Sequence, residues 1–316
     1  MTAGSRAGLE ALKTWAQVLA ELRCFFADRE ILEVQTPLAR NYAVTDPYLN
    51  CFRLDAPGMQ NSHSRLHLQP SPEPAMKQLL AAGSGSIYQI CKAFRAGEQG
   101  RNHLPEFTLL EWYRQGYDHW QLMDEVAELV NQVLGARPVE KIAWREAYIR
   151  FAGIDPVTAT EQALAACAGD SGIESVGTAD HDDRRRLLLD QILVSRVEAN
   201  LGQGCYTFLH DYAADQAALA RVSDDPWPVA ERFELYIDGL EIANGFHELN
   251  DSVEQRRRFE QEVAYRRKNG LPEVDLDEPL LDCLDRLPDC AGIALGVDRL
   301  IKIKTGVPDL NTTPVR

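Results

Sequence analysis

Acidic residues recur at short spacing in the stretch RFELYIDGLEIANGFHEL, residues 232–249. Alternating residues on both sides of Asp238-Gly239 predict two strands joined by a two-residue turn. In such a hairpin Glu234 and Glu241 are diagonal neighbours on one face, about 7 to 8 Å apart. Like charges at that spacing repel each other unless a cation lies between them, and oxygen ligands on rigid strands suit Mg²⁺ bound against a phosphate. A sheet face exposed to solvent is the alternative interpretation of the same pattern.

A polar loop at residues 95–105 separates two predicted strands, at residues 87–94 and 107–113. The loop is too long for a tight hairpin and is rich in cationic and hydrogen-bonding groups, which favours a functional loop. On the second strand Glu111 and Tyr113 share one face by the two-residue period. An acid and a phenol together could bind an ammonium group through charge and ring face. The alternative is that Glu111 pairs with a core arginine.

A third stretch, CAGIALGVDRL at residues 290–300, predicts an apolar strand that runs into a helix near Gly296. Small residues inside a strand usually allow close approach of a ligand or of another backbone. Arg299 falls in the first turn of that helix, where the helix dipole disfavours a cation. A triphosphate tail would account for its position, and an ion pair with a neighbouring carboxylate is the alternative.

The rest of the sequence predicts the elements that position these residues. Apolar residues at spacings of three and four over residues 7–29 predict an amphipathic helix that packs along a sheet or a partner subunit. Ser71 is the predicted cap of another helix, with Glu73 as an acid in its first turn. Ser252 and Gln255 fit a capping box. Further helical stretches are predicted at residues 118–134, at about 138–205 and at 252–269.

Composition narrows the class of protein. A length of 316 residues with 45% hydrophobic content allows one large domain or two ordinary ones. No apolar run approaches the roughly 18 residues of a membrane span, and no secretory signal precedes the first helix, so we expect a cytoplasmic protein. The seven cysteines include no C-x-x-C pair, which argues against a disulfide framework and a zinc ribbon. A net charge of −15 disfavours a nucleic-acid partner and suits a basic protein surface.

Three stretches resemble, in the right order, the signature motifs of class II aminoacyl-tRNA synthetases of the lysyl branch. ILEVQTPL (residues 31–38) resembles motif 1 at the dimer interface, FRAGEQGRNHLPEFTLLEWY (94–113) resembles motif 2, and GIALGVDRL (292–300) resembles motif 3. The resemblance covers about residues 7–303. It implies an α+β fold with an antiparallel sheet flanked by helices, a homodimer formed through motif 1, and ATP and Mg²⁺ as cofactors.

The resemblance also implies a role for each matching residue. Those implied to contact ATP are Arg95, Glu98, His103, Leu104, Phe107, Glu241 and Arg299, with Glu234 and Glu241 as Mg²⁺ ligands. Those implied to contact the amino acid are Ser71, Glu73, Glu111, Tyr113, Asn244, Glu248, Ala294 and Gly296. Arg95 and Arg299 would be catalytic, because such a site drives attack of a carboxylate on the α-phosphate by positioning and charge neutralisation.

Within the amino-acid site, the resemblance assigns one group of residues to each end of the substrate. The far amino group of a lysine-like substrate would meet Glu111, Tyr113 and Glu248. The near amino group would meet Glu73, and the carboxylate would meet Asn244.

Lysyl-tRNA synthetases carry an anticodon-binding β-barrel before motif 1, whereas only residues 1–30 precede it here. The chain therefore resembles the stand-alone paralogues of the PoxA/GenX group, which activate a β-lysine and transfer it to a lysine side chain of elongation factor P. This implies a single catalytic domain over residues 1–316 with a mainly helical insertion at about 138–205. It also implies lysine or β-lysine as substrate, no anticodon-binding domain, no tRNA partner and no membrane partner.

The sequence departs from the synthetase pattern at three positions. Ala294 replaces a glycine of motif 3, and a methyl group in a tight pocket discriminates between substrates by about 1 to 3 kcal/mol, so we expect it to act against α-lysine. The acid expected two residues after Arg95 is Gly97, with Glu98 next. Leu104 stands where the group usually has asparagine, so a contact there would come from its backbone.

Two other functions fit the same fold. One is an amidating ligase of the asparagine synthetase A type, but a site for a cation does not suit an aspartate side chain. The other is a catalytically silent paralogue that binds an amino acid. A silent protein has no need for the predicted triphosphate-binding residues, so an adenylate-forming enzyme is the favoured function.

Overall fold

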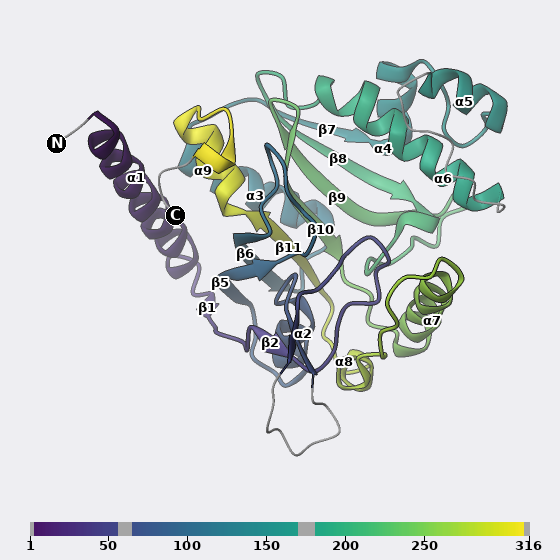
Figure 1. Cartoon of the computed structure of the whole chain (residues 1–316), viewed down its shortest axis with the longest axis horizontal. Coiled ribbons are helices and arrows are strands. Elements are labelled where there is room, and N and C mark those ends of the chain that lie inside the picture. Colours follow the sequence, from purple (N-terminus) through teal and green to yellow (C-terminus); the bar gives the residue numbers. More distant parts are fainter. Residues whose placement is uncertain (1–2, 56–64, 170–180, 313–316) are drawn as a thin grey trace. The chain divides into compact units, whose positions relative to one another are not determined.

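The computed structural model describes residues 3–55, 65–169 and 181–312 (Figure 1). The chain divides into two compact units. The first comprises Met1–Gly135 with Gly245–Arg316, and the second comprises Ala136–Asn244. Both units combine a largely antiparallel sheet with helices, so the predicted α+β fold is confirmed. The prediction of a single domain with one insertion remains a prediction.

The strands of the first unit follow the order β1 (Leu32–Glu33), β5 (Ile87–Phe94), β6 (Glu106–Gln115) and β11 (Cys290–Gly296). β1 runs parallel to β5, and the other neighbours are antiparallel. The middle of β6 is buried on both faces, and Glu111 is a charged residue within this buried stretch. The register places Tyr113 opposite Gly292 and Glu111 opposite Ala294, so motif 2 and motif 3 residues become neighbours.

Helices and a small second sheet complete the first unit. The helices are α1 (Ala3–Ala27), α2 (Glu73–Ala81), α3 (His119–Leu134), α7 (Ser252–Lys268), α8 (Glu278–Leu284) and α9 (Val297–Thr305). The second sheet has the order β2 (Ala39–Arg40), β4 (Arg65–Leu68), β3 (Arg53–Asp55). α1 packs against α3 and α9, whereas α2 packs against α8. None of the described helices is both long enough and apolar enough to span a membrane.

The helices begin close to where the sequence predicts, with two corrections. Ser71 does not occupy the cap of α2, because Pro72 stands there and the helix begins one residue later than predicted. Asp251 caps α7 through its carboxylate, in place of the predicted capping box of Ser252 and Gln255. A carboxylate satisfies the first amide groups of a helix at least as well as a hydroxyl, so Asp251 takes the position.

The second unit contains the predicted hairpin. Its strands follow the order β10 (Leu240–His247), β9 (Val229–Ile237), β8 (Tyr206–Ala213) and β7 (Val139–Ala143), and β10 ends in the first unit. Asp238 and Gly239 join β9 to β10 with φ angles of 52° and 74°. Positive φ at both turn residues defines the tight turn that matches strand twist, so the predicted hairpin is confirmed.

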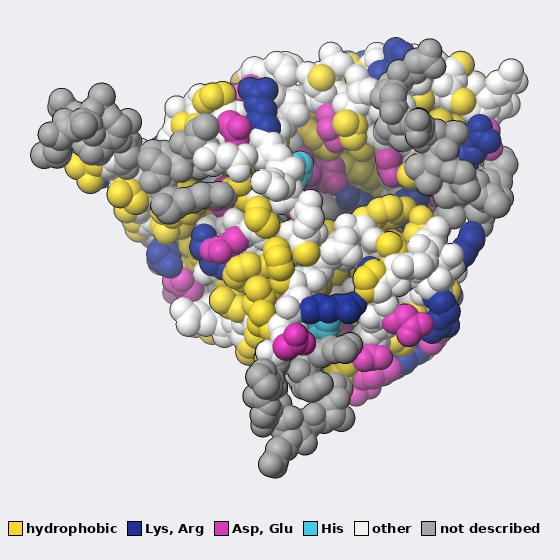
Figure 2. All heavy atoms as spheres, viewed as in Figure 1, with side chains coloured by type: hydrophobic (Ala, Val, Ile, Leu, Met, Phe, Trp, Pro, Cys, Tyr) yellow, Lys and Arg dark blue, Asp and Glu magenta, His cyan; other side chains and the backbone are white. Residues whose placement is uncertain are grey.

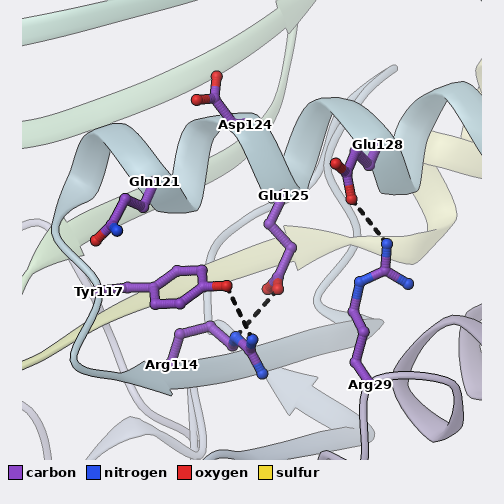
Figure 3. A pocket seen from close by; sticks show the side chains of 7 residues that line it. All are labelled: Arg29, Arg114, Tyr117, Gln121, Asp124, Glu125 and Glu128. Carbon is purple, nitrogen blue, oxygen red and sulfur yellow. Dashed lines mark hydrogen bonds and ion pairs between the residues drawn. The ribbon is translucent and has the colours of Figure 1, made fainter.

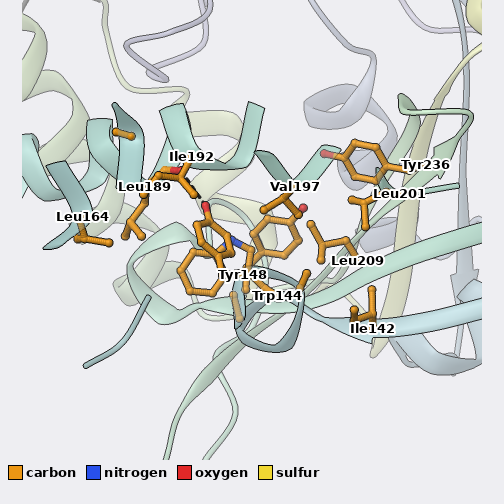
Figure 4. Close-up of a cluster of buried hydrophobic side chains, with 14 of the residues drawn as sticks. Ile142, Trp144, Tyr148, Leu164, Leu189, Ile192, Val197, Leu201, Leu209 and Tyr236 are labelled. Atoms are coloured by element: carbon orange, nitrogen blue, oxygen red, sulfur yellow. Dashed lines mark hydrogen bonds between the residues drawn. The ribbon is translucent and has the colours of Figure 1, made fainter. Parts of the chain in front are cut away.

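The stretch predicted as mainly helical at about 138–205 contains α4 (Trp144–Ala147), α5 (Glu161–Ala168) and α6 (His181–Ile192). Its first residues form β7 instead, parallel to β8. Figure 4 shows the aromatic and aliphatic core that these elements share, and the Tyr148 hydroxyl donates a hydrogen bond of 2.8 Å to the Leu189 carbonyl. This core supports β8, the strand beside the hairpin.

Candidate active site

A buried carboxylate lies at the centre of the first unit's predicted amino-acid site. Glu111 is 2% exposed, and its two oxygens accept hydrogen bonds from the hydroxyls of Ser71, at 2.6 Å, and Tyr113, at 2.7 Å. Burial, and then the charge of Glu73, raise the pKa of Glu111 to about 8. No described arginine accounts for its burial through a hydrogen bond or ion pair with it, so the alternative of a core ion pair is not supported.

Two more carboxylates join this group through a lysine that the sequence did not single out. The Lys77 ammonium lies 2.6 Å from a Glu73 oxygen and 2.6 Å from a Glu248 oxygen. Burial lowers the pKa of Lys77, but the charges of Glu248 and Glu73 outweigh it and raise that pKa above its ordinary value. Burial raises the pKa of Glu248 to about 7, against the opposing charge of Lys77. We call Ser71, Glu73, Glu111, Tyr113 and Glu248 the amine site.

The backbone of β11 closes one side of the amine site. A Cβ on Gly292 would lie 2.3 Å from Tyr113 Cε1 and 2.4 Å from Glu248 Oε1, so only glycine fits at this position. Residues two apart on a strand share a face, so the methyl group of Ala294 points to the same side as that vacant Cβ position. Gly296 is less crowded, because a Cβ there would meet only Arg299, at 3.5 Å.

The motif 2 loop and the start of α9 bring the predicted ATP residues of the first unit together in two groups. In one, Arg95 lies over the Phe107 ring at 5.1 Å and pairs with Glu98 at 3.5 Å. The Nε of Arg95 is buried and has no hydrogen-bond partner among the described residues. A buried donor without a hydrogen-bond partner destabilises the folded chain, so an anionic ligand at this position would complete the hydrogen bonding of Arg95. Gly97 has a φ of 86°, which explains why glycine replaces an acid there.

In the other group, Arg299 donates a hydrogen bond of 2.9 Å to His103 Nε2 and one of 3.3 Å to the Asn102 carbonyl. Burial and the Arg299 charge lower the pKa of His103, so the ring stays neutral and accepts that hydrogen bond. Asp298 accepts a hydrogen bond of 2.5 Å from the backbone N–H of Thr108, which ties α9 to β6.

The Leu104 side chain is buried at 3% exposure, so it packs in the interior. The predicted contact of the Leu104 backbone with ATP remains a prediction.

The hairpin of the second unit gathers the predicted metal ligands. Glu234 is 6% exposed, and it accepts hydrogen bonds from Tyr212, at 2.6 Å, Tyr236, at 2.8 Å, and Arg232, at 2.5 Å. Burial, and then the Glu234 charge, raise the pKa values of both tyrosines, which keeps them as donors. The charge of Glu241 acts on the same arginine and tyrosines, so both carboxylates lie near one cluster, and their role as metal ligands remains a prediction.

These acids fit a magnesium ion by their chemistry, because Mg²⁺ prefers carboxylate oxygens and usually takes one or two of them together with phosphate. Arg232 was not among the residues predicted from the sequence, although the alternation R-F-E places it on the same strand face as Glu234. Arg232 also donates a hydrogen bond of 3.3 Å to the Asn244 side-chain oxygen. It therefore orients a predicted metal ligand and the predicted partner of the substrate carboxylate.

A separate surface pocket of the first unit contains none of the predicted site residues (Figure 3). It is lined by Arg29, Arg114, Tyr117, Gln121, Asp124, Glu125 and Glu128. Its charges pair with one another: Arg114 lies 3.0 Å from Glu125, and Arg29 lies 2.7 Å from Glu128. These ion pairs connect α3 to β6 and to the end of α1, so we interpret the pocket as structural.

The whole chain matches a known family. Residues 5–313 match the family model described as tRNA synthetases class II (D, K and N), and the chain belongs to this family of class II synthetases. Among its relatives is the elongation factor P–(R)-β-lysine ligase of Salmonella typhi, 45% identical over 297 residues, which covers 93% of this chain and 91% of the relative. The proteins of the same name from Salmonella agona and Salmonella enteritidis PT4 match equally well. The predicted class, a ligase of the class II synthetase family, is therefore confirmed.

Proposed function

We propose that the chain uses ATP to activate lysine, with (R)-β-lysine preferred, as an aminoacyl-adenylate, and then transfers the lysyl group to a lysine side chain of elongation factor P. The observation that carries this proposal is the amine site, which groups two buried carboxylates, Glu111 and Glu248, with the partly buried carboxylate of Glu73, a set of acids suited to ammonium groups. The printed name of the Salmonella relatives supports the choice of β-lysine and of the acceptor.

In the proposed first step, a carboxylate oxygen of lysine forms a bond to the α-phosphorus of ATP, and the bond from that phosphorus to the pyrophosphate oxygen breaks. Glu111 and Glu248 hold the far amino group, and Asn244 orients the carboxylate. The Arg95 guanidinium, with its unsatisfied Nε donor, neutralises charge at the α-phosphate, while Arg299 holds the outer phosphates.

Mg²⁺ bound by Glu234 and Glu241 would further reduce the negative charge of the phosphates. In the second step the side-chain amine of the acceptor lysine attacks the carbonyl carbon of the adenylate. An amide bond forms, the bond to AMP breaks, and the amine loses a proton.

We further propose a homodimer and a cytoplasmic location. Motif 1 leaves Leu32 at 56% and Leu38 at 39% exposure, and Figure 2 shows hydrophobic side chains gathered on the face over β2 and β5. Exposed apolar side chains in such number mark a contact surface. A cytoplasmic location fits an acceptor that is a translation factor, which here takes the place of tRNA.

The alternative ligase of the asparagine synthetase A type would place an aspartate carboxylate against Glu111 and Glu248. Like charges in a buried site destabilise each other, so this substrate is disfavoured. A silent amino-acid-binding paralogue would leave the buried Arg95 donor and the paired His103 and Arg299 without a use.

Mass spectrometry of elongation factor P, after incubation with the chain, ATP and each lysine isomer, tests the proposal. We expect a mass increase of one lysyl group on one residue, larger with (R)-β-lysine and absent without ATP. Glu111→Gln should abolish the increase, whereas the matched buried control Glu125→Gln, which replaces the partner of Trp112 and Arg114, should retain it. Unmodified elongation factor P with every isomer would contradict the proposal.

A further inference from the structure

Lys77 is a buried cation inside a site that is predicted to bind cations. Its side chain is 1% exposed and extends from α2 between Glu73 of the same helix and Glu248 at the end of β10. Buried ion pairs stabilise proteins little, because desolvation of the charges offsets their attraction. A well-packed apolar residue would serve the fold at least as well, so the lysine needs a functional reason.

The count of charges supplies a reason. Glu73, Glu111 and Glu248 carry three negative charges when ionised, and Lys77 contributes one positive charge. A diamino acid brings two ammonium groups, so the occupied amine site becomes neutral. Without Lys77, two carboxylates that share one ammonium partner would face each other directly, and one of them would bind a proton.

The ion pairs of Lys77 involve specific oxygens of the Glu73 and Glu248 carboxylates. Lys77 pairs with one oxygen of each, Glu73 Oε1 and Glu248 Oε2. The other oxygen of Glu248, Oε1, lies beside Gly292 and the Tyr113 ring, on the side where β11 closes the site. Lys77 therefore fixes the orientation of Glu248 through one oxygen, while the other oxygen lies on the side of β11.

We propose that Lys77 is a positioning residue that holds the carboxylates of Glu73 and Glu248 in place before the diamino acid binds, and whose charge favours the ionised form of Glu248. This inference rests on the proposed function, because it concerns binding of the same substrate. Lys77 does not contact the reacting phosphorus or carboxylate in this proposal. It acts through the two glutamates, so its loss should weaken lysine binding and leave ATP binding intact.

The titratable groups around Lys77 come from four parts of the fold. They are Glu73 on α2, Glu111 and Tyr113 on β6, His247 and Glu248 at the end of β10, and Cys283 on α8. Burial raises the pKa of Cys283, so its thiol stays neutral at physiological pH. The carboxyl whose ionisation depends on Lys77 is therefore that of Glu248.

Lysine-dependent exchange of pyrophosphate into ATP tests the inference with Lys77→Met, a neutral side chain of similar length. We expect the KM for lysine to rise at least tenfold at pH 7, with the KM for ATP within twofold of wild type. The ratio of variant to wild-type lysine KM should fall as pH rises from 7 to 9, because high pH ionises the carboxyl that has gained a proton. Lys77→Arg, which keeps the charge, should stay closer to wild type than Lys77→Met.

A folded Lys77→Met variant with wild-type lysine KM, or with equal increases for lysine and ATP, would overturn the inference. If Lys77→Met does not fold, Lys77→Met combined with Glu73→Gln removes one charge of each sign. The inference is supported if the ratio of the double variant's lysine KM to the wild-type lysine KM does not change with pH. It is contradicted if that ratio still falls as the pH rises. Absence of lysine-dependent exchange in wild type would refute the proposed function itself.

Discussion

Replacing Gly292 by alanine should weaken lysine binding through a single added methyl group. The new Cβ would lie 2.3 Å from Tyr113 Cε1 and 2.4 Å from Glu248 Oε1, whereas non-bonded atoms prefer separations of about 3.5 to 4.0 Å. The Tyr113 ring is buried and its hydroxyl is bonded to Glu111, while the other Glu248 oxygen is held by Lys77. Neither neighbour can move aside without losing a buried partner.

The expected size of the effect follows from overpacking. Extra carbon atoms in a well-packed interior cost about 1 to 3 kcal/mol. If that energy is lost from the amine site, the KM for lysine rises about 5-fold to 150-fold, since each 1.4 kcal/mol corresponds to about a factor of ten. Lysine-dependent pyrophosphate exchange measures this KM, and thermal unfolding measures how much of the cost falls on stability instead.

Gly296→Ala on the same strand provides the comparison. A Cβ there would lie 3.5 Å from Arg299, which is an ordinary contact. We therefore expect a much smaller change in the KM for lysine, and any larger effect should fall on the KM for ATP. The reasoning fails if Gly292→Ala is fully folded and keeps its lysine KM within twofold of wild type. It also fails if both alanine variants change lysine KM equally.

Three further predictions concern the other parts of the site. Ala294→Gly removes the methyl group beside the amine site and should raise α-lysine activity relative to β-lysine, and an unchanged isomer ratio in pyrophosphate exchange would count against this role. Glu241→Gln should reduce exchange by at least a hundredfold and raise the Mg²⁺ concentration needed for half-maximal activity; exchange at the wild-type rate would remove Glu241 from the metal site. Glu111→Gln should abolish lysine-dependent exchange and raise the Tm at pH 8. The pKa of Glu111 is raised from 4.5 to about 8 in the folded chain, so the folded state keeps a proton that the unfolded state has lost, and stability falls as pH rises between these values. A neutral amide avoids that loss, so a lower Tm for Glu111→Gln than for wild type at pH 8 would contradict the argument.

Elements that depend on local chemistry could be predicted from the sequence. The turn at Asp238-Gly239 needs two positive φ angles, and that pair of residues supplies them without help from the rest of the chain. The start of α3 is equally local, because Asp118 and Gln121 form a capping box within four residues. The resemblance to synthetase motifs added the residue roles, which periodicity alone could not supply.

Elements that depend on distant partners could not be predicted in this way. β7 is a strand because it pairs with β8, more than 60 residues further along the chain, and its own sequence, VEKIA, has only a weak strand pattern. Lys77 had a visible signal, its position four residues after Glu73 on one helix. Its importance arises from Glu248, which lies far away in sequence and meets it only after folding.

The amine site buries charge in a way that does not favour the fold, as expected of a site arranged for a ligand. Burial raises the pKa values of Glu111 and Glu248, so both carboxyls resist ionisation in the folded chain until a cation arrives. Lys77 supplies one such cation permanently, and it is the one that neutral packing could have replaced. When Glu73, Glu111 and Glu248 are all ionised and Lys77 is charged, two further positive charges are needed to neutralise the amine site. A diamino acid provides them, whereas an acidic or neutral amino acid does not. Under the proposed function, selectivity for lysine-like substrates would follow from the balance of charge in the site, and the shape of β11 would then have only to choose between isomers.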